Sequence, residues 1–166
     1  MPRYLYLLRH AESTEKQLHE NDKDRALSSR GIKEALMIGT YLFKQNTPLN
    51  IIMSSTAARA LTTANLVTDA LRIDSDKISP QEDLYDASPR IFLQFVSLLD
   101  DTYQHVMCVG HNPAISYLAE HFTKAEIGDM VPGGLSIISF DINSWKEVSQ
   151  GNGELIRYVF PDMLVE

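Results

Sequence analysis

Near its N-terminus the sequence reads Tyr4-Leu5-Tyr6-Leu7-Leu8-Arg9-His10, an apolar run that ends in two basic residues. A short apolar run of this length predicts a β-strand. In open α/β sheets, ligands bind beyond the carboxyl ends of the strands. Arg9 and His10 follow the predicted strand directly, so they are the first candidate site residues.

The rest of the chain alternates short apolar runs with stretches of helical periodicity. Further strands are expected at residues 50–53, 77–79, 105–109, 135–141 and 154–160, the last two as an antiparallel pair. Helices are expected at 29–45 and 57–71, and after the cap-plus-proline pairs Ser88-Pro89 and Asn112-Pro113. The first helix should bury one apolar face, made of Ile32, Ala35, Leu36, Ile38, Gly39 and Leu42. This order predicts an α/β fold: a three-layer sandwich with a mostly parallel central sheet flanked by helices, in a single domain spanning residues 1–166.

Composition limits the class of protein. The chain has 166 residues, of which 44% are apolar and 22% charged, as expected for a folded globular domain. A net charge of -7 argues against general binding to nucleic acid or anionic membranes, which requires a basic surface. The apolar runs are far shorter than the roughly 18 residues of a membrane span, and no signal-peptide pattern is expected at the N-terminus. Cys108 is the single cysteine, which excludes an intramolecular disulfide and makes a cytoplasmic location the expectation.

Three segments that follow predicted strands carry basic side chains: Arg9-His10, residues 54–59 with Arg59, and Gly110-His111. We expect them to meet at one edge of the sheet. Imidazole is a good nucleophile toward phosphorus, and arginine donates bidentate hydrogen bonds to phosphate. The set therefore predicts phosphoryl transfer through a phosphohistidine intermediate. A metal site at His10 and His111 is disfavoured, because arginines repel a cation and no metal-ligand spacing is present.

Five stretches, in order along the chain, carry a family resemblance. They are Leu7-Leu8-Arg9-His10-Ala11-Glu12-Ser13, residues 24–31 (DRALSSRG), residues 54–64 (SSTAARALTTA), Val109-Gly110-His111-Asn112-Pro113 and Pro132-Gly133-Gly134-Leu135. Together they resemble the motifs of the histidine phosphatase superfamily, which has the phosphoglycerate mutase-like fold. The GHNP form of the fourth stretch, the short chain and the DxxRxLSxRG pattern are most similar to SixA-type phosphohistidine phosphatases.

This resemblance implies that His10 is the nucleophile and that Arg9, Arg59 and His111 complete the catalytic, phosphate-binding set. The usual glycine after the histidine is Ala11 here. Lys16 stands near the place of an asparagine in mutase-like members, which argues against a mutase. Relatives that act on phosphate esters carry a general acid after the third strand, where Glu82, Asp83 and Asp86 are the alternatives in this chain.

The expected activity is that of a hydrolase acting on phosphoric monoesters or phosphoramidates, with no metal and no cofactor. Its expected substrate is phosphohistidine on a signalling or phosphotransfer protein, because the chain leaves little room for a lid over a small ligand. The first alternative is a phosphatase of the same superfamily that acts on small-molecule phosphate esters. The second is a non-catalytic module that binds phosphoproteins. Neither nucleic acid nor a membrane is an expected partner.

Overall fold

The predicted strands lie in one six-stranded sheet. The computed structural model describes residues 1–165, and its strands are β1 (Arg3–Arg9), β2 (Ile51–Ser55), β3 (Ile78–Gln81), β4 (His105–Gly110), β5 (Leu135–Phe140) and β6 (Gly153–Val159). Their order across the sheet is β3-β2-β4-β1-β5-β6. The first four are parallel neighbours, whereas β5 runs antiparallel to both β1 and β6. The expected mostly parallel sheet, with a late antiparallel pair, is confirmed.

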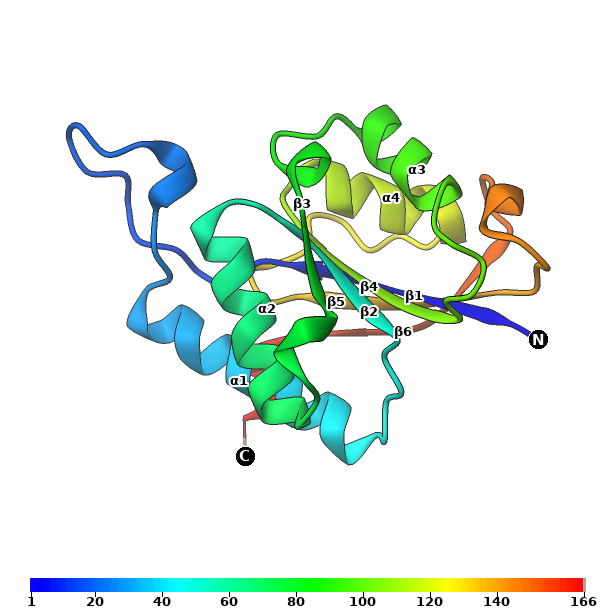
Figure 1. Cartoon of the computed structure of the whole chain (residues 1–166), viewed down its shortest axis with the longest axis horizontal. Helices are drawn as coiled ribbons and strands as arrows, with labels where there is room; N and C mark the ends of the chain where they lie inside the picture. Colours follow the sequence, from blue (N-terminus) through cyan, green and yellow to red (C-terminus); the bar gives the residue numbers. More distant parts are fainter. Residues whose placement is uncertain (166) are drawn as a thin grey trace.

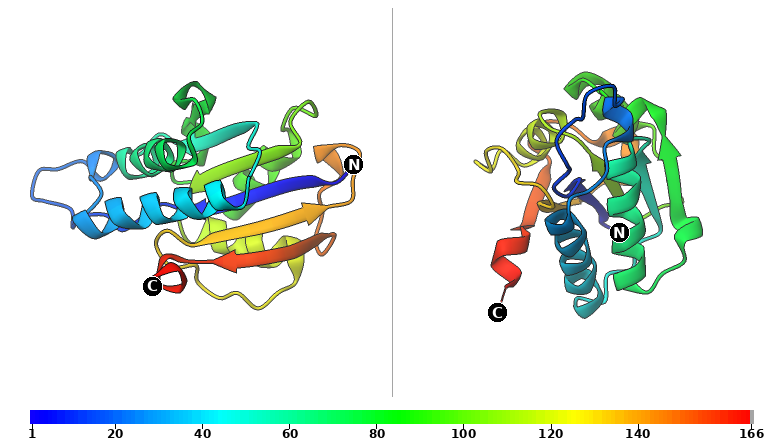
Figure 2. Two further views of the ribbon diagram at one scale, coloured as in Figure 1. Left: turned by 90° about the horizontal axis from the view of Figure 1, so that it is seen from below. Right: turned by 90° about the vertical axis from the view of Figure 1, so that its left-hand side faces the viewer.

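Four α-helices form the outer layers. They are α1 (Ser29–Lys44), α2 (Ala58–Leu71), α3 (Pro89–Ser97) and α4 (Ala114–Thr123). Figure 1 shows α1 and α2 on one face of the sheet and α3 and α4 on the other, and the left view of Figure 2 looks onto the sheet from the side of α1 and α2. Short 3-10 helices occupy the connections: η1 (Asp22–Asp24), η2 (Ser75–Lys77), η3 (Glu82–Leu84), η4 (Trp145–Glu147) and η5 (Pro161–Leu164). The predicted three-layer sandwich is confirmed.

The central strands are buried on both faces, which explains their nearly continuous apolar sequences. Along β1, Leu5 and Leu7 face the core under α3 and α4, whereas Tyr6 and Leu8 face the core under α1 and α2. Cys108 lies mid-strand in β4 and is fully buried, and this burial raises the pKa of its thiol to about 12. Within residues 1–165, no helix has the length and apolar character required to cross a membrane.

Two details of the helices differ from the sequence prediction. In α1, Ala35, Ile38 and Leu42 are buried as expected, but Ile32 and Leu36 are exposed. The buried stripe of this helix is narrower than predicted because one sheet face is shared between α1 and α2.

The start of α4 also differs from the prediction. Ser88 caps α3 as predicted, since its side chain accepts a hydrogen bond from the Ile91 N–H. Asn112 was expected to cap α4 in the same way, and that prediction is wrong: the N-cap residue is Pro113, without a side-chain cap. The Asn112 Oδ1, which would be the capping atom, instead accepts a hydrogen bond from Ser116 Oγ at 2.5 Å, while Asn112 Nδ2 donates to the Met130 carbonyl.

Candidate active site

The topology places the ends of three adjacent parallel strands side by side. Arg9, the last residue of β1, pairs in register with Gly110, the last residue of β4. The His10 N–H donates to the Gly110 carbonyl at 3.1 Å. The rings of His10 and His111 are consequently neighbours, with centroids 5.0 Å apart. Arg59 follows β2 in the first turn of α2. The structure therefore brings the four predicted site residues to one edge of the sheet.

His10 is held in one orientation by its own backbone. Its Nδ1 donates to the Ala11 carbonyl at 2.7 Å, which leaves Nε2 as the ring nitrogen with the free lone pair. The side chain is buried, and burial lowers the pKa of His10 to about 4. The positive charges of Arg59, Arg9 and Arg25 act in the same direction. At neutral pH His10 is thus an uncharged imidazole with an available nitrogen.

His111 is fixed from the opposite side by a buried serine. Its Nε2 lies 2.7 Å from Ser55 Oγ, which also accepts a hydrogen bond from the Ala57 N–H. The Ser55 hydroxyl can donate its hydrogen to an unprotonated Nε2, and in that tautomer the His111 proton lies on Nδ1. Within residues 1–165, that buried Nδ1 has no hydrogen-bond partner. Burial, with the nearby His10 and Arg59, lowers the pKa of His111 to about 3.

Arg9 and the backbone of His10 are held by contacts with the segment before β5. Arg9 Nη1 donates to the Met130 carbonyl at 2.7 Å, and Asn112 Nδ2 donates to the same oxygen at 3.1 Å. Gly133 N–H lies 3.1 Å from the carbonyl oxygens of both Arg9 and His10. Its φ of 76° lies in the left-handed region, where glycine is favoured. The glycine turn identified in the sequence therefore holds the backbone of the Arg9-His10 pair.

Sequence reasoning missed the carboxylate that holds Arg59. In the projecting segment between β1 and α1, the Asp22 carbonyl accepts from Arg59 Nη1 at 2.8 Å, and its carboxylate lies 3.2 Å from Nη2. Tyr85 donates its hydroxyl to the same carboxylate at 2.9 Å. Partial burial opposes ionisation of Asp22, but Tyr85 and Arg59 outweigh it and lower the pKa of Asp22. Arg25 Nε approaches the other carboxylate oxygen at 3.1 Å.

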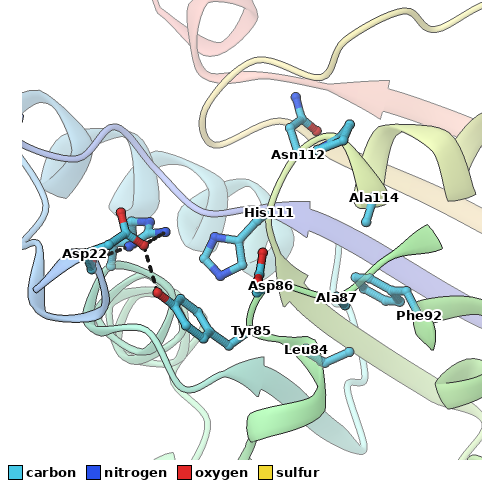
Figure 3. A pocket seen from close by; sticks show the side chains of 11 residues that line it. Asp22, Leu84, Tyr85, Asp86, Ala87, Phe92, His111, Asn112 and Ala114 are labelled. Carbon is cyan, nitrogen blue, oxygen red and sulfur yellow. Dashed lines mark hydrogen bonds and ion pairs between the residues drawn. The ribbon is translucent and has the colours of Figure 1, made fainter. Parts of the chain in front are cut away.

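These side chains border a pocket of about 160 Å³ (Figure 3). Its lining includes Arg59 and His111 from the predicted set, together with Asp22, Tyr85 and Asp86. The Tyr85 ring meets the His111 ring edge-on, with centroids 5.9 Å apart. The lining of the pocket therefore contains two of the predicted basic residues, Arg59 and His111, together with the carboxylates of Asp22 and Asp86.

The three acidic residues after β3 lie in different surroundings. Glu82 forms an ion pair with Lys23 at 2.7 Å and accepts from Thr56 Oγ1 at 2.6 Å. Asp83 lines a separate surface groove beside α3. Asp86 alone among the three lines the pocket that contains His111. Elsewhere within residues 1–165, no group of three or more His, Cys, Asp or Glu side chains is arranged to hold a metal ion.

Comparison with known proteins finds relatives of this fold. A family model of the histidine phosphatase superfamily (branch 1) matches residues 5–85. The structure of the putative phosphohistidine phosphatase SixA from Agrobacterium tumefaciens has a TM-score of 0.82 at 27% identity, and covers 97% of this chain and 99% of that one. The protein histidine phosphatase SixA complexed with tungstate also has a TM-score of 0.82, at 19% identity, with coverages of 98% and 99%. The uncharacterized protein Rv1276c of Mycobacterium tuberculosis is 27% identical over 151 residues, which are 84% of this chain and 91% of that protein.

The fold, together with these matches, defines the class as phosphatases with the phosphoglycerate mutase-like architecture. Within that class the chain is similar to the histidine phosphatase superfamily, whose family model matches residues 5–85, as the resemblance of its motifs implies.

Proposed function

We propose that this protein is a phosphatase that forms a covalent phosphohistidine intermediate on His10. The observation that carries the proposal is the 2.7 Å hydrogen bond from His10 Nδ1 to the Ala11 carbonyl. It fixes the proton on Nδ1 and leaves the lone pair on Nε2. Because the pKa of His10 is lowered to about 4, the ring is uncharged and nucleophilic at neutral pH.

The reaction has two displacement steps at phosphorus. First, His10 Nε2 forms a bond to the phosphorus atom of the substrate, and the bond from phosphorus to the leaving atom breaks with its electron pair on that atom. A water oxygen then attacks phospho-His10, the P–N bond breaks, and the pair returns to Nε2. The products are inorganic phosphate and the dephosphorylated substrate. No step requires a metal ion or a cofactor.

Arg9, Arg59 and His111 would stabilise the charge on the transferred group. In both steps the equatorial oxygens carry negative charge, which cations and hydrogen-bond donors offset. Arg59 is 6% exposed, so its guanidinium acts from a site with little water, where such interactions are stronger. The unpartnered Nδ1 of His111 supplies a further donor. A bound phosphoryl dianion would raise the pKa of His111, which favours the doubly protonated ring.

The proposed substrate is phosphohistidine on a signalling or phosphotransfer protein in the cytoplasm. Two observations support it: the pocket is small, at about 160 Å³, and the whole-chain match at 27% identity is to a putative phosphohistidine phosphatase. A small pocket suits a single side chain presented by another protein. The alternative, a small-molecule phosphate ester, stays open as an outcome of the test.

The test is to trap phospho-His10. The protein is mixed with a ³²P-phosphohistidine peptide and quenched after milliseconds in alkaline detergent, since phosphohistidine survives alkali. We expect label on the protein, mapped to His10, in wild type and in the control His121→Asn, whose ring lies on α4 against Tyr117. His10→Asn should carry no label and turn over at least about a thousandfold more slowly.

Each other outcome has a defined meaning. Peptide binding without turnover or label would favour the non-catalytic module. Rapid turnover of sugar phosphates or nucleotides, with little on the phosphohistidine peptide, would favour the small-ester phosphatase. Label at a residue other than His10 would overturn the proposed nucleophile.

A further inference from the structure

The pocket next to the two histidines contains one carboxylate that is held by other side chains and one that is not. Asp22 is engaged by Arg59 and Tyr85. Asp86 also lines the pocket, but within residues 1–165 its carboxylate has no hydrogen-bond or ion-pair partner. Figure 3 shows the two carboxylates with the His111 ring between them in this view. Asp86 is therefore a negative charge available to a ligand.

The backbone holds Asp86 in a conformation that few residues adopt. Its φ is 54°, in the left-handed region, where Asp and Asn are the favoured non-glycine residues. The residue lies in the turn between η3 and α3, immediately after Tyr85. This turn places Asp86 at the rim while Leu84 and Phe92, both fully buried, form the apolar base of the pocket.

The pocket thus combines an apolar base, an aromatic wall and a free carboxylate beside the phosphate-binding cations. A flat ring that carries an N–H and a positive charge complements these features. A ligand group with a negative charge at this position does not, because the Asp86 carboxylate would repel it.

We propose that this pocket receives the leaving group and that Asp86 selects an imidazolium ring by accepting a hydrogen bond from its distal N–H. The proposal rests on the proposed phosphatase function and specifies its substrate. Asp86 would be a specificity-determining residue in direct contact with the substrate, and neither Glu82 nor Asp83 would share this role.

The chemistry explains why a carboxylate at this position increases the rate. When His10 Nε2 displaces the substrate nitrogen, the P–N electron pair moves onto the leaving imidazole. If the distal nitrogen of that ring carries a proton, the ring departs as neutral imidazole rather than as the far more basic imidazolate. A carboxylate bonded to the distal N–H favours the protonated ring. No proton has to be delivered to the departing atom.

The experiment compares Asp86→Asn with wild type on three substrates. Asparagine keeps the size of the side chain and tolerates the left-handed backbone, so it removes the charge alone. The substrates are a phosphohistidine peptide, p-nitrophenyl phosphate, which leaves as a stable anion, and glycerol 2-phosphate, which leaves as a poor alkoxide. Asp83→Asn is the matched control, because that neighbouring carboxylate lines a different groove.

We expect Asp86→Asn to lower kcat/KM for the phosphohistidine peptide about tenfold or more, the effect of one charge-assisted hydrogen bond. Hydrolysis of p-nitrophenyl phosphate should stay within about threefold of wild type or rise, because its leaving group needs no cation partner. Imidazole should compete with p-nitrophenyl phosphate in wild type and less strongly in Asp86→Asn. Asp83→Asn should match wild type in every assay.

Three results would overturn the proposal, and they are distinguishable. Equal losses on all three substrates would show that Asp86 only maintains the local structure. A loss greatest on glycerol 2-phosphate would identify Asp86 as a proton donor to ester oxygens instead. If wild type hydrolyses p-nitrophenyl phosphate but not the phosphohistidine peptide, the substrate in the proposed function is wrong, whatever the variant does.

Discussion

Ser55 Oγ lies 2.7 Å from Nε2 of His111, and the serine side chain is completely buried. Ser55 is the last residue of β2, whereas His111 directly follows β4, the neighbouring parallel strand. The pairing of two strands therefore determines which nitrogen of His111 meets the serine hydroxyl.

We expect Ser55→Ala to impair catalysis through His111. Without the hydroxyl, the buried imidazole loses its partner at Nε2, so its proton is no longer restricted to Nδ1. A lost buried hydrogen bond of this kind should lower kcat about tenfold with a smaller change in KM. The measurement is steady-state kinetics, with ¹⁵N NMR of His111 to report which ring nitrogen carries the proton. Ser54→Ala is the control, because the Ser54 hydroxyl donates to the Ser55 carbonyl rather than to a histidine. Equal effects of the two variants would contradict the assignment.

We expect Asp22, which forms an ion pair with Arg59, to compete with phosphate for that guanidinium. In Asp22→Asn the backbone bond from Arg59 Nη1 to the residue 22 carbonyl is retained, while the carboxylate charge beside Nη2 is lost. We expect inorganic phosphate to inhibit the variant about two- to fivefold more strongly, the range for a partly exposed ion pair. The difference should shrink at high salt. Glu82→Gln is the control, since it breaks the Lys23 ion pair outside the pocket. Weaker inhibition of Asp22→Asn would mean that the carboxylate serves to orient Arg59.

The two active-site histidines should make the fold sensitive to acid. Folded His10 stays neutral down to about pH 4, whereas in the unfolded chain it takes up a proton near its ordinary pKa of 6.5. Between these values the unfolded state binds more protons, so the free energy of unfolding falls as the pH is lowered. His10 alone accounts for about 3 kcal/mol over that window. His111, with a pKa of about 3, acts in the same direction.

Urea unfolding at pH 7 and pH 4.5 measures this effect. His10→Asn should show a smaller loss of stability between the two pH values than wild type, while His121→Asn should show the wild-type loss. An unchanged pH dependence in His10→Asn would contradict the low pKa of His10.

The convergence of the four candidate residues on one edge of the sheet could be predicted because their positions follow from chain order and strand periodicity. Apolar runs located β1, β2 and β4, and a parallel sheet brings the residues after such strands to one edge. The parts that were missed depend on loop conformation. Asp22 lies 37 residues before Arg59 in a segment without periodicity, and its carboxylate meets that guanidinium only because η1 turns back toward α2. The DxxR pattern there contains the Asp22–Arg25 ion pair, yet nothing in the pattern indicated Arg59 as a second partner of the aspartate.

Local rules also failed where a distant partner was available. Asn112 before Pro113 has the composition of a helix cap, but its Oδ1 accepts from the Ser116 hydroxyl and its Nδ2 donates to the Met130 carbonyl, 18 residues further along the chain. Similarly, Ile32 and Leu36 continue the apolar periodicity of α1 and yet remain exposed, because burial depends on how α1 and α2 divide the sheet face. Hydrophobic periodicity predicts which face of a single helix or strand is apolar. It does not tell which neighbouring element covers that face.

Gly31 offers a test of how α1 supports the orientation of His10. It lies in the first turn of α1, against the backbone of Glu12, and a Cβ at this position would overlap the Glu12 carbonyl. The Ser28 N–H donates to that same carbonyl at 2.9 Å, so the helix start and the chain after His10 are joined. Replacing glycine with alanine normally stabilises a helix by up to about 1 kcal/mol. At Gly31 we expect the replacement to destabilise the protein instead.

Gly31→Ala should lower the free energy of unfolding by about 1–3 kcal/mol, the usual cost of overpacking. It should also lower kcat/KM at least tenfold, because displacement of Glu12 moves the Ala11 carbonyl that orients His10. Urea unfolding and steady-state kinetics on the same samples measure both quantities. Lys33→Ala, at an exposed position of the same helix, should alter neither by much. If Gly31→Ala loses stability but keeps full activity, the orientation of His10 depends on the bond from the Ala11 N–H to Thr63 of α2 rather than on α1.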